Sequence, residues 1–270
     1  MHLSAAELCA DIRIDVLEKS KAVGFGHLGG TFSVVEILVA LFLSPRLSLL
    51  PPTTGEESHD FFILSKGHAC LAYFCLLNRL GILSDDLLDT YGTDGGLGGQ
   101  MDISIPGVTW NTGSLGHSVG VGAGIAIAAK TKQRNVVCLI GDAELSEGAM
   151  WEAFHLAGEM RLANLITIVD NNGLSVSDEF SMPRLEDKMT SFGWNYLECD
   201  GHSLPDLNSA LSQAAASQAP TLLCANTVKG KGVSFMESNS SWHHGTPSEV
   251  EFFNALKQLK EGRMAAHEGH

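Results

Sequence analysis

Short apolar runs alternate with longer stretches of helical periodicity along this chain. Apolar runs of five or six residues predict buried strands at residues 60–64, 136–140, 165–169, 195–200 and 221–226. Apolar residues recurring every three or four positions predict helices at residues 3–22, 33–43, 69–80, 84–91, 118–130, 147–160, 185–192, 204–217 and 249–259. This alternation favours an α/β fold in which helices flank a parallel sheet.

The stretch from residue 136 to residue 176 contains the most informative polar side chains. One buried strand ends at Gly141-Asp142, a helix follows, and a second buried strand ends at Asp170-Asn171-Asn172-Gly173. A β-α-β unit brings the ends of its two strands to one edge of the sheet, so we expect Asp142 and Asn172 to lie side by side. Open α/β sheets bind their ligands at this edge.

The side chains of Asp142 and Asn172 offer oxygen ligands, which suit Mg²⁺ or Ca²⁺ better than zinc. Because Mg²⁺ is usually held by one or two protein groups and by phosphates, the pair predicts a metal that carries a diphosphate. The N-terminal end of the next helix would also favour that anion. The alternative is an ordinary β-α-β unit in which both residues only form turns.

Composition excludes several function classes. The 270 residues carry 31 acidic and 17 basic side chains, a net charge of −14, with no basic stripe, so we expect no nucleic acid partner. No apolar run is long enough to span a membrane, and the first ten residues lack the features of a signal peptide. The six cysteines have no paired metal spacing and are interpreted as buried reduced thiols, which predicts a cytoplasmic protein.

The string GDAELSEG at residues 141–148, followed by DNNGL at residues 170–174, resembles the thiamine diphosphate motif. The chain is similar to the N-terminal half of transketolase, in the form found as a separate subunit. This resemblance implies the thiamine-diphosphate-binding fold, with a diphosphate-binding domain over residues 1–262. It also implies that Asp142, Asn172 and the backbone carbonyl of Leu174 bind the metal. Ala143 replaces a glycine of the motif, whose backbone N–H binds the diphosphate.

Other motifs stand in the family's order. The string SKGHA at residues 65–69 implies that His68 contacts the cofactor, and TGSLG at residues 112–116 implies that Gly113, Ser114 and Leu115 bracket the aminopyrimidine ring. WHHG at residues 242–245 assigns His244 to the diphosphate and the substrate, with His243 as the weaker choice. A dinucleotide site is the alternative for the glycines at residues 116–124, although the GxGxxG spacing is absent. The basic turn at residues 227–232 could meet phosphate, but we interpret it as solvated.

Three residues bear on the substrate and on catalysis. GHLG at residues 26–29 resembles a family loop whose histidine contacts the donor sugar, which implies this role for His27. Gln100 stands where the family has a histidine that contacts the donor sugar, and glutamine cannot be protonated near neutral pH. Glu147 matches a glutamate that links two active sites across the family's dimer interface, or else it only caps a helix. The resemblance thus implies catalytic roles for His27, Glu147 and His244.

The resemblance implies transfer of a two-carbon ketol unit from a ketose to an aldose, with thiamine diphosphate and Mg²⁺. In the family the carboxylate that activates the cofactor belongs to a second, pyrimidine-binding domain, and this chain ends before such a domain. We therefore expect a separate C-terminal transketolase subunit, in an α₂β₂ heterotetramer. The alternatives are a thiamine enzyme for a modified sugar or a 2-oxo acid, a 2-oxo-acid dehydrogenase component, and a non-catalytic regulatory subunit. Residues 263–270 are expected to form a disordered tail.

Overall fold

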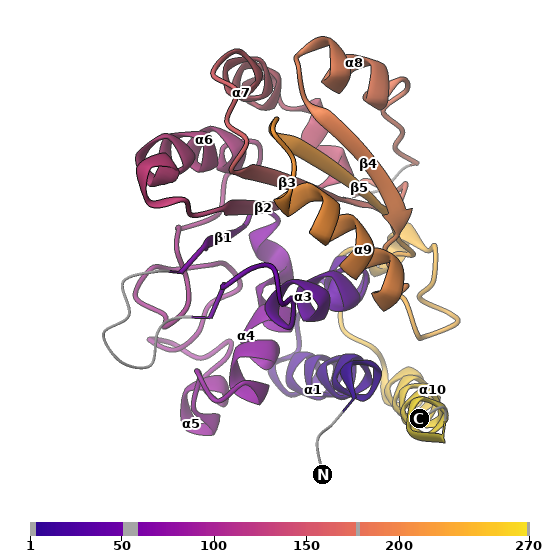
Figure 1. Cartoon of the computed structure of the whole chain (residues 1–270). Coiled ribbons are helices and arrows are strands. Elements are labelled where there is room, and N and C mark those ends of the chain that lie inside the picture. The colour runs from indigo at the N-terminus through magenta and orange to yellow at the C-terminus, as the bar shows by residue number, and fades with distance from the viewer. Residues whose placement is uncertain (1–3, 51–58, 177–178, 269–270) are drawn as a thin grey trace.

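A parallel sheet forms the centre of the molecule (Figure 1). The computed structural model describes residues 4–50, 59–176 and 179–268, and within them five strands pair in the order β1-β2-β3-β5-β4. Neighbouring strands all run parallel, and Gly141 at the end of β2 lies opposite Asp170 in β3. The strands confirm the predicted runs: β1 (Phe61–Leu64), β2 (Val136–Gly141), β3 (Leu165–Asn171), β4 (Asn195–Asp200) and β5 (Thr221–Asn226).

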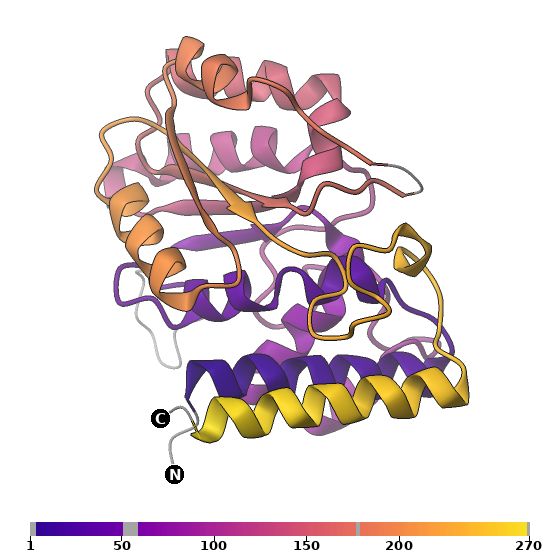
Figure 2. The same cartoon turned by 90° about the vertical axis from the view of Figure 1, so that its right-hand side faces the viewer.

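Helices cover both faces of the sheet, as Figure 1 shows. One face carries α6 (Ser118–Ala129), α7 (Gly148–Glu159) and α8 (Leu185–Ser191). The other face carries α3 (Val35–Phe42) and α9 (Leu204–Ala215), and α1 (Ala5–Val23) and α4 (Cys70–Arg79) pack against α3. The long helix α10 (Glu249–Glu268) lies along α1 (Figure 2). The shorter helices are α2 (Leu28–Phe32) and α5 (Asp85–Leu88).

Two hydrophobic clusters enclose the sheet, because successive side chains of a strand point to opposite faces. In β2, Val137 and Leu139 belong to one cluster, and Cys138 and Ile140 belong to the other. All six cysteines are unpaired and all but the half-buried Cys199 are buried, which confirms the interpretation as reduced thiols. Among the described residues, no helix combines the length and the apolarity that a membrane span needs.

Two predictions about helices were wrong. The glycine loop before residue 33 already forms the buried helix α2, and α3 begins only at Val35. A side chain at Gly29 would place its Cβ 2.8 Å from the carbonyl oxygen of Trp242, so glycine permits a close approach there. The structure also continues α10 to Glu268, where a disordered tail was expected. Contacts with α1 explain this extension, because Arg263 pairs with Asp11 and the His267 ring lies 2.8 Å from Glu7.

Candidate active site

The carboxyl ends of β2 and β3 bring the predicted pair together. One oxygen of the Asp142 carboxylate accepts a hydrogen bond from the backbone N–H of Gly173 (2.7 Å), next to Asn172. Asp142 is only 2% exposed. The predicted adjacency of Asp142 and Asn172 is therefore confirmed, and it follows from the parallel pairing of the two strands.

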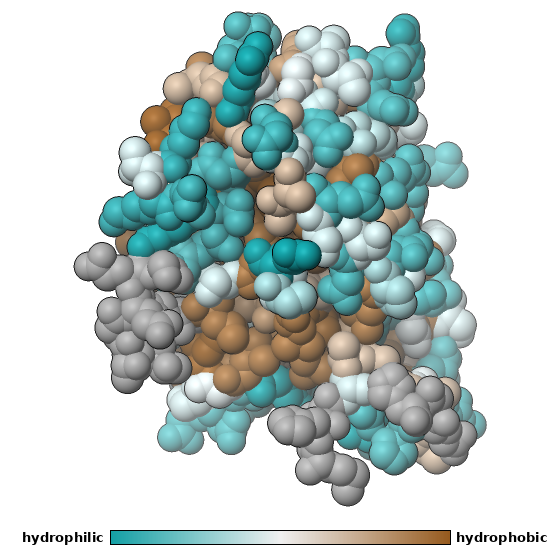
Figure 3. Space-filling view, in the orientation of Figure 1, coloured by the Kyte–Doolittle hydropathy of each residue, from teal (hydrophilic) through white to brown (hydrophobic). Residues whose placement is uncertain are grey.

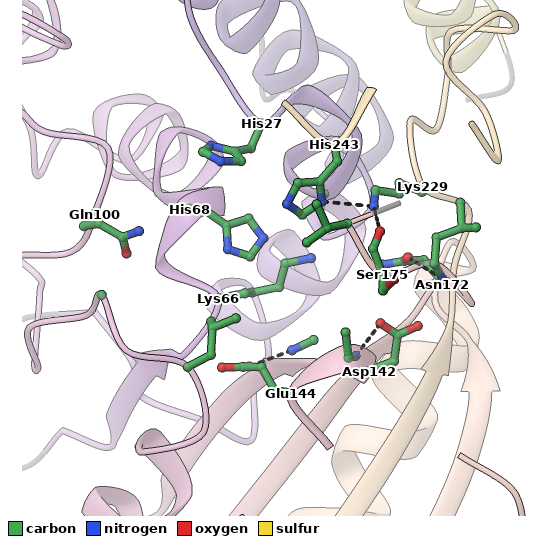
Figure 4. A pocket seen from close by; sticks show the side chains of 17 residues that line it. His27, Lys66, His68, Gln100, Asp142, Glu144, Asn172, Ser175, Lys229 and His243 are labelled. Carbon is green, nitrogen blue, oxygen red and sulfur yellow. Dashed lines mark hydrogen bonds between the residues drawn. The ribbon is translucent and has the colours of Figure 1, made fainter. Parts of the chain in front are cut away.

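A cavity of about 240 Å³ opens at this edge, where β2 and β3 meet the N-terminal segments (Figure 4). Its wall combines carboxylates, ammonium groups and imidazoles from separate segments of the chain. The lining residues are His27, Gly30, Lys66, His68, Gln100, Gly113, Leu115, Gly141, Asp142, Ala143, Glu144, Asn172, Leu174, Ser175, Val176, Lys229 and His243.

The oxygen donors on the wall fit a hard divalent cation. Asp142, Asn172 and Leu174 lie together, and the Asn172 side-chain oxygen accepts a hydrogen bond from the Leu174 N–H (3.3 Å). Burial, with a contribution from Asp170, raises the pKa of Asp142 to about 6, so a bound cation would relieve an unfavourable buried charge. Over the described residues there is no group of three histidine, cysteine or carboxylate side chains that could hold a metal, so a metal here needs the amide and backbone oxygens.

The backbone at Ala143 accommodates a side chain. Ala143 is the second residue of a short 3₁₀ helix (Asp142–Ser146), and its φ angle is not positive, so the side chain introduces no backbone strain. Its N–H, however, donates to the second oxygen of Asp142 (2.8 Å). The N–H can reach a diphosphate only after the Asp142 carboxylate turns toward another partner.

A buried ion pair between Lys66 and Asp170 lies at the floor of the cavity. Asp170 also accepts hydrogen bonds from Thr227 (2.5 Å), Ser33 (2.7 Å) and Asn172 (3.1 Å). Burial by itself would raise the pKa of Asp170, but Lys66, Thr227 and Ser33 outweigh burial and lower it. The carboxylate is therefore fully bonded, and it holds the Lys66 ammonium group in the cavity wall (Figure 4).

A second buried ammonium group comes from Lys229, which is 2% exposed. Its Nζ donates to the carbonyl oxygen of Ser175 (2.8 Å) and lies 3.1 Å from Nδ1 of His243. Since an ammonium group only donates, Nδ1 of His243 accepts, and the ring proton is placed on Nε2. Burial and the neighbouring Lys66 lower the pKa of Lys229 to about 8. The interpretation of the basic turn at residues 227–232 as solvated was thus wrong for Lys229.

Four histidine rings cluster at the mouth of the cavity. The ring centroid of His27 lies 5.2 Å from that of His68, 5.6 Å from that of His243 and 4.8 Å from that of His244. Burial, then the nearby cations, lowers the pKa of His68 to about 2 and that of His243 to about 4. Burial and His244 lower the pKa of His27. These three rings are therefore neutral near pH 7, so each offers one N–H donor and one acceptor.

Glu144 connects three segments of the chain around the cavity through hydrogen bonds. Its carboxylate accepts from the Ser65 hydroxyl (2.7 Å) and from the backbone N–H groups of Gly116 (3.3 Å) and Gly141 (2.9 Å). Burial raises the pKa of Glu144. The sequence reasoning missed Glu144, Asp170 and Lys66, although Lys66 stands in the SKGHA string.

A second cavity of about 560 Å³ adjoins the first and shares His27 and Gln100 with it. Its other polar lining includes Asp102, Asn111 and His244. Gln100 is exposed, and its side-chain oxygen accepts from the Thr112 hydroxyl (2.8 Å).

The structure separates three predicted site residues from the first cavity. His243 lines it with Asp142, whereas His244 lines the second cavity, so the prediction that His244 contacts the diphosphate stays a prediction. Gly113 and Leu115 line the first cavity, but the exposed Ser114 does not. Glu147 is the exposed residue before α7 and is likewise outside the lining.

Comparison with known proteins agrees with this geometry. A family model described as "Transketolase, thiamine diphosphate binding domain" matches residues 4–262. One subunit of the apulose-4-phosphate transketolase of Phocaeicola vulgatus is 36% identical and aligns over 92% of this chain and 90% of its own length. This chain belongs to the transketolase family. Another member, 6-deoxy-6-sulfo-D-fructose transketolase subunit SqwG of a Clostridium species, is 35% identical over 93% of this chain and 94% of its own length.

Solved transketolases share the fold. The transketolase of Campylobacter jejuni superposes with a TM-score of 0.85 at 27% identity, over 98% of this chain but 46% of that one. The transketolase of Leishmania mexicana superposes with a TM-score of 0.83 at 21% identity, over 100% of this chain and 46% of that one. The chain therefore spans slightly less than half the length of these solved transketolases.

Proposed function

We propose that this chain is the component of a split transketolase that binds the metal and diphosphate of thiamine diphosphate. With a separate C-terminal subunit it transfers a two-carbon ketol unit from a ketose to an aldose. The observation that carries the proposal is the first cavity, a space of about 240 Å³ that is lined by oxygen donors and by two buried ammonium groups. Oxygen donors suit Mg²⁺, and buried ammonium groups attract phosphate strongly.

Each wall of the cavity has a separate role in this proposal. Asp142, Asn172 and the carbonyl of Leu174 hold Mg²⁺, while Lys229 and His243 hold the diphosphate. The Nε2–H that Lys229 imposes on His243 makes that ring a donor toward an anionic oxygen. When bound, thiamine diphosphate supplies the electron sink for ketol transfer.

The second cavity receives the sugars. Sugar hydroxyl groups must lose and regain protons during ketol transfer. His27 lies between the two cavities, and its lowered pKa keeps the ring neutral, so the ring can accept a proton from a donor hydroxyl. His244 and Gln100 orient the same hydroxyl groups from the walls of the second cavity.

A modified sugar is the second candidate for the donor, and Gln100 favours it. The amide of Gln100 can donate and accept hydrogen bonds, but it cannot exchange a proton as histidine can. Two relatives are named for unusual substrates, apulose 4-phosphate and 6-deoxy-6-sulfo-D-fructose. Activity on a modified ketose would keep the cofactor chemistry unchanged and alter only the contacts at the sugar end.

The surface of α6 supports a partner subunit. This helix has the sequence SVGVGAGIAIAA, so its outward face has no charged side chain, and Gly120, Gly124 and Ile127 are exposed on it. Leu156 and Met160 add exposed apolar surface from the neighbouring α7 region, where Figure 3 shows apolar residues at the upper left. A helix that is apolar on all sides is normally buried in an assembly. We propose that the C-terminal subunit covers this face in an α₂β₂ heterotetramer.

Calorimetry tests the proposal directly. Thiamine diphosphate with Mg²⁺ is titrated into this chain alone, into a C-terminal transketolase subunit from the same organism, and into the mixture. We expect tight binding only in the mixture, followed by ketol transfer when ketoses and aldoses are added. Equal binding by the isolated chain would contradict the need for a partner, and no binding in any sample would reject the function.

A further inference from the structure

His202 lies behind the turn that carries Lys229, outside both cavities described above. It lies two residues after the end of β4, and its side chain is 11% exposed. The backbone N–H of Val228 donates to Nε2 of His202 (2.8 Å), while Nδ1 lies 2.9 Å from a carboxylate oxygen of Glu36. One ring therefore connects α3 to the residue that precedes Lys229.

These contacts fix the tautomer of the ring. Because the Val228 N–H can only donate, Nε2 carries no proton, so Nδ1 carries it and donates to Glu36. Glu36 also receives two hydrogen bonds of 2.6 Å from the guanidinium group of Arg13, which in turn donates to the carbonyl of Phe32 (2.9 Å). Arg13 and Glu36 are buried. These hydrogen bonds form a continuous network from α1 through α3 to the turn.

Packing alone does not hold the turn from behind. A cavity of about 230 Å³ lies there, and its lining includes Arg13, Glu36, His202 and Gly232. Side chains therefore leave free space beside Gly232. The hydrogen bond from Val228 joins the turn to the fold between two backbone contacts, in which the N–H groups of Thr227 and Gly230 donate to the carbonyls of Asn171 and Gly29. Loss of this acceptor would leave the N–H of Val228 without its partner, and the backbone of residues 228 and 229 would be held less firmly.

The position of the turn matters for the active site. Lys229 reaches from it to Ser175 and His243, at the side of the first cavity assigned to the diphosphate. We propose that His202, held by Glu36 and Arg13, is a positioning residue that fixes the turn and thereby sets the affinity for the diphosphate. This inference rests on the proposed function for the identity of the ligand, but not for the effect of His202 on the turn.

The test compares His202→Leu, which keeps the bulk and removes both hydrogen bonds, with His202→Gln, which can restore one of them. Lys231→Met is the control, because it removes a cation from the same turn but outside the cavity lining. The dissociation constant of inorganic diphosphate with Mg²⁺ is measured by calorimetry on the full chain with its partner subunit. Hydrogen exchange follows the amides of residues 227–232.

We expect His202→Leu to weaken diphosphate binding about fivefold to tenfold, with faster exchange in the turn. His202→Gln should recover part of this loss, and Lys231→Met should bind like the wild type. In the loaded enzyme, the KM for thiamine diphosphate should rise while kcat at saturation stays unchanged, a split that general unfolding would not produce.

Two results would overturn the inference. One is amide hydrogen exchange in the turn of His202→Leu that is as slow as in the wild type, which would show that His202 does not hold the turn. The other concerns diphosphate affinity. If Lys229→Met binds diphosphate more weakly, but His202→Leu shows faster exchange in the turn and binds as tightly as the wild type, His202 does not set the affinity. If the wild type itself fails to bind diphosphate, the proposed function fails, and the exchange measurement still decides whether His202 holds the turn.

Discussion

The two ends of the site differ in how firmly the chain holds their side chains. At the diphosphate end, Asp142 and Lys229 are each 2% exposed, and Asp170 is fully buried in an ion pair. At the sugar end, Gln100 and Asp102 are exposed and lie on loops. Buried charges interact strongly and tolerate little change, whereas exposed polar groups are screened by water. Under the proposed function, a chain built in this way could change its sugar while it keeps the chemistry of its cofactor.

Asp142→Asn should have the largest effect, because it removes the carboxylate from the proposed metal site. We expect the dissociation constant of thiamine diphosphate with Mg²⁺ to rise at least about 100-fold, since even outer partners of metal ligands cost about 10–100-fold. The stability of the folded protein at pH 7 should change little, because two effects oppose each other. The pKa of Asp142 is raised to about 6, so removing its charge relieves a cost, but the amide can accept from only one of the N–H groups of Ala143 and Gly173.

The matched control for this prediction is Asp86→Asn, an exposed carboxylate on α5. It should bind as the wild type does. Calorimetry and thermal unfolding of the two variants separate a metal ligand from a general charge effect. An Asp142→Asn protein with wild-type affinity would remove Asp142 from the metal site.

Lys66→Met tests how much the buried ion pair of Lys66 and Asp170 contributes to stability. Leaving Asp170 buried and unpaired should lower the free energy of unfolding by about 3–5 kcal/mol. Urea denaturation measures this loss, and the double variant Lys66→Met/Asp170→Asn should recover much of it. The more exposed pair of Lys19 and Asp89 gives the control, because Lys19→Met should cost no more than about 1 kcal/mol. Equal losses at the two pairs would contradict the comparison.

Lys229→Met should weaken diphosphate binding about tenfold at pH 7, because a charged hydrogen bond is lost. The pKa of Lys229 is lowered to about 8, so the ammonium form that attracts the anion disappears as pH rises through that value. Affinity of the wild type should therefore fall between about pH 7 and pH 9 relative to that of the variant. Parallel pH profiles for the two proteins would show that Lys229 does not bind the diphosphate.

Gln100→His should have the smallest effect and confine it to the sugar end. The affinity for thiamine diphosphate should stay within about twofold of the wild type, while the ratio of rates between ketose donors shifts severalfold. Initial rates of the assembled enzyme across ordinary and modified ketose phosphates measure this ratio. An unchanged preference would mean that Gln100 does not select the donor.

Local sequence patterns were sufficient for the sheet and for part of the site. The apolar runs placed all five strands, and the β-α-β pattern placed Asp142 beside Asn172, since parallel strands end at one edge. His68 and Gln100 also line the first cavity. These predictions succeeded because each depends on neighbouring residues or on one crossover.

Predictions that depended on distant contacts were less successful. The helix α10 extends through residues 263–268 because α1 offers Asp11 and Glu7, more than 250 positions earlier. The different surroundings of His243 and His244 depend on Lys229, whose ammonium group lies 3.1 Å from Nδ1 of His243 beside the first cavity. Adjacent histidines give no local signal for this difference.

The sequence by itself determined the strands, the faces they bury, the polar turns at their ends and the family to which the chain belongs. Periodicity and short motifs carry this information, because they reflect local backbone geometry. Only the tertiary structure decided which charges pair. Lys66 meets Asp170 across 104 positions and His202 meets Glu36 across 166. Such partners are chosen by the folded shape, because a buried charge is tolerated only where another element supplies its counterpart.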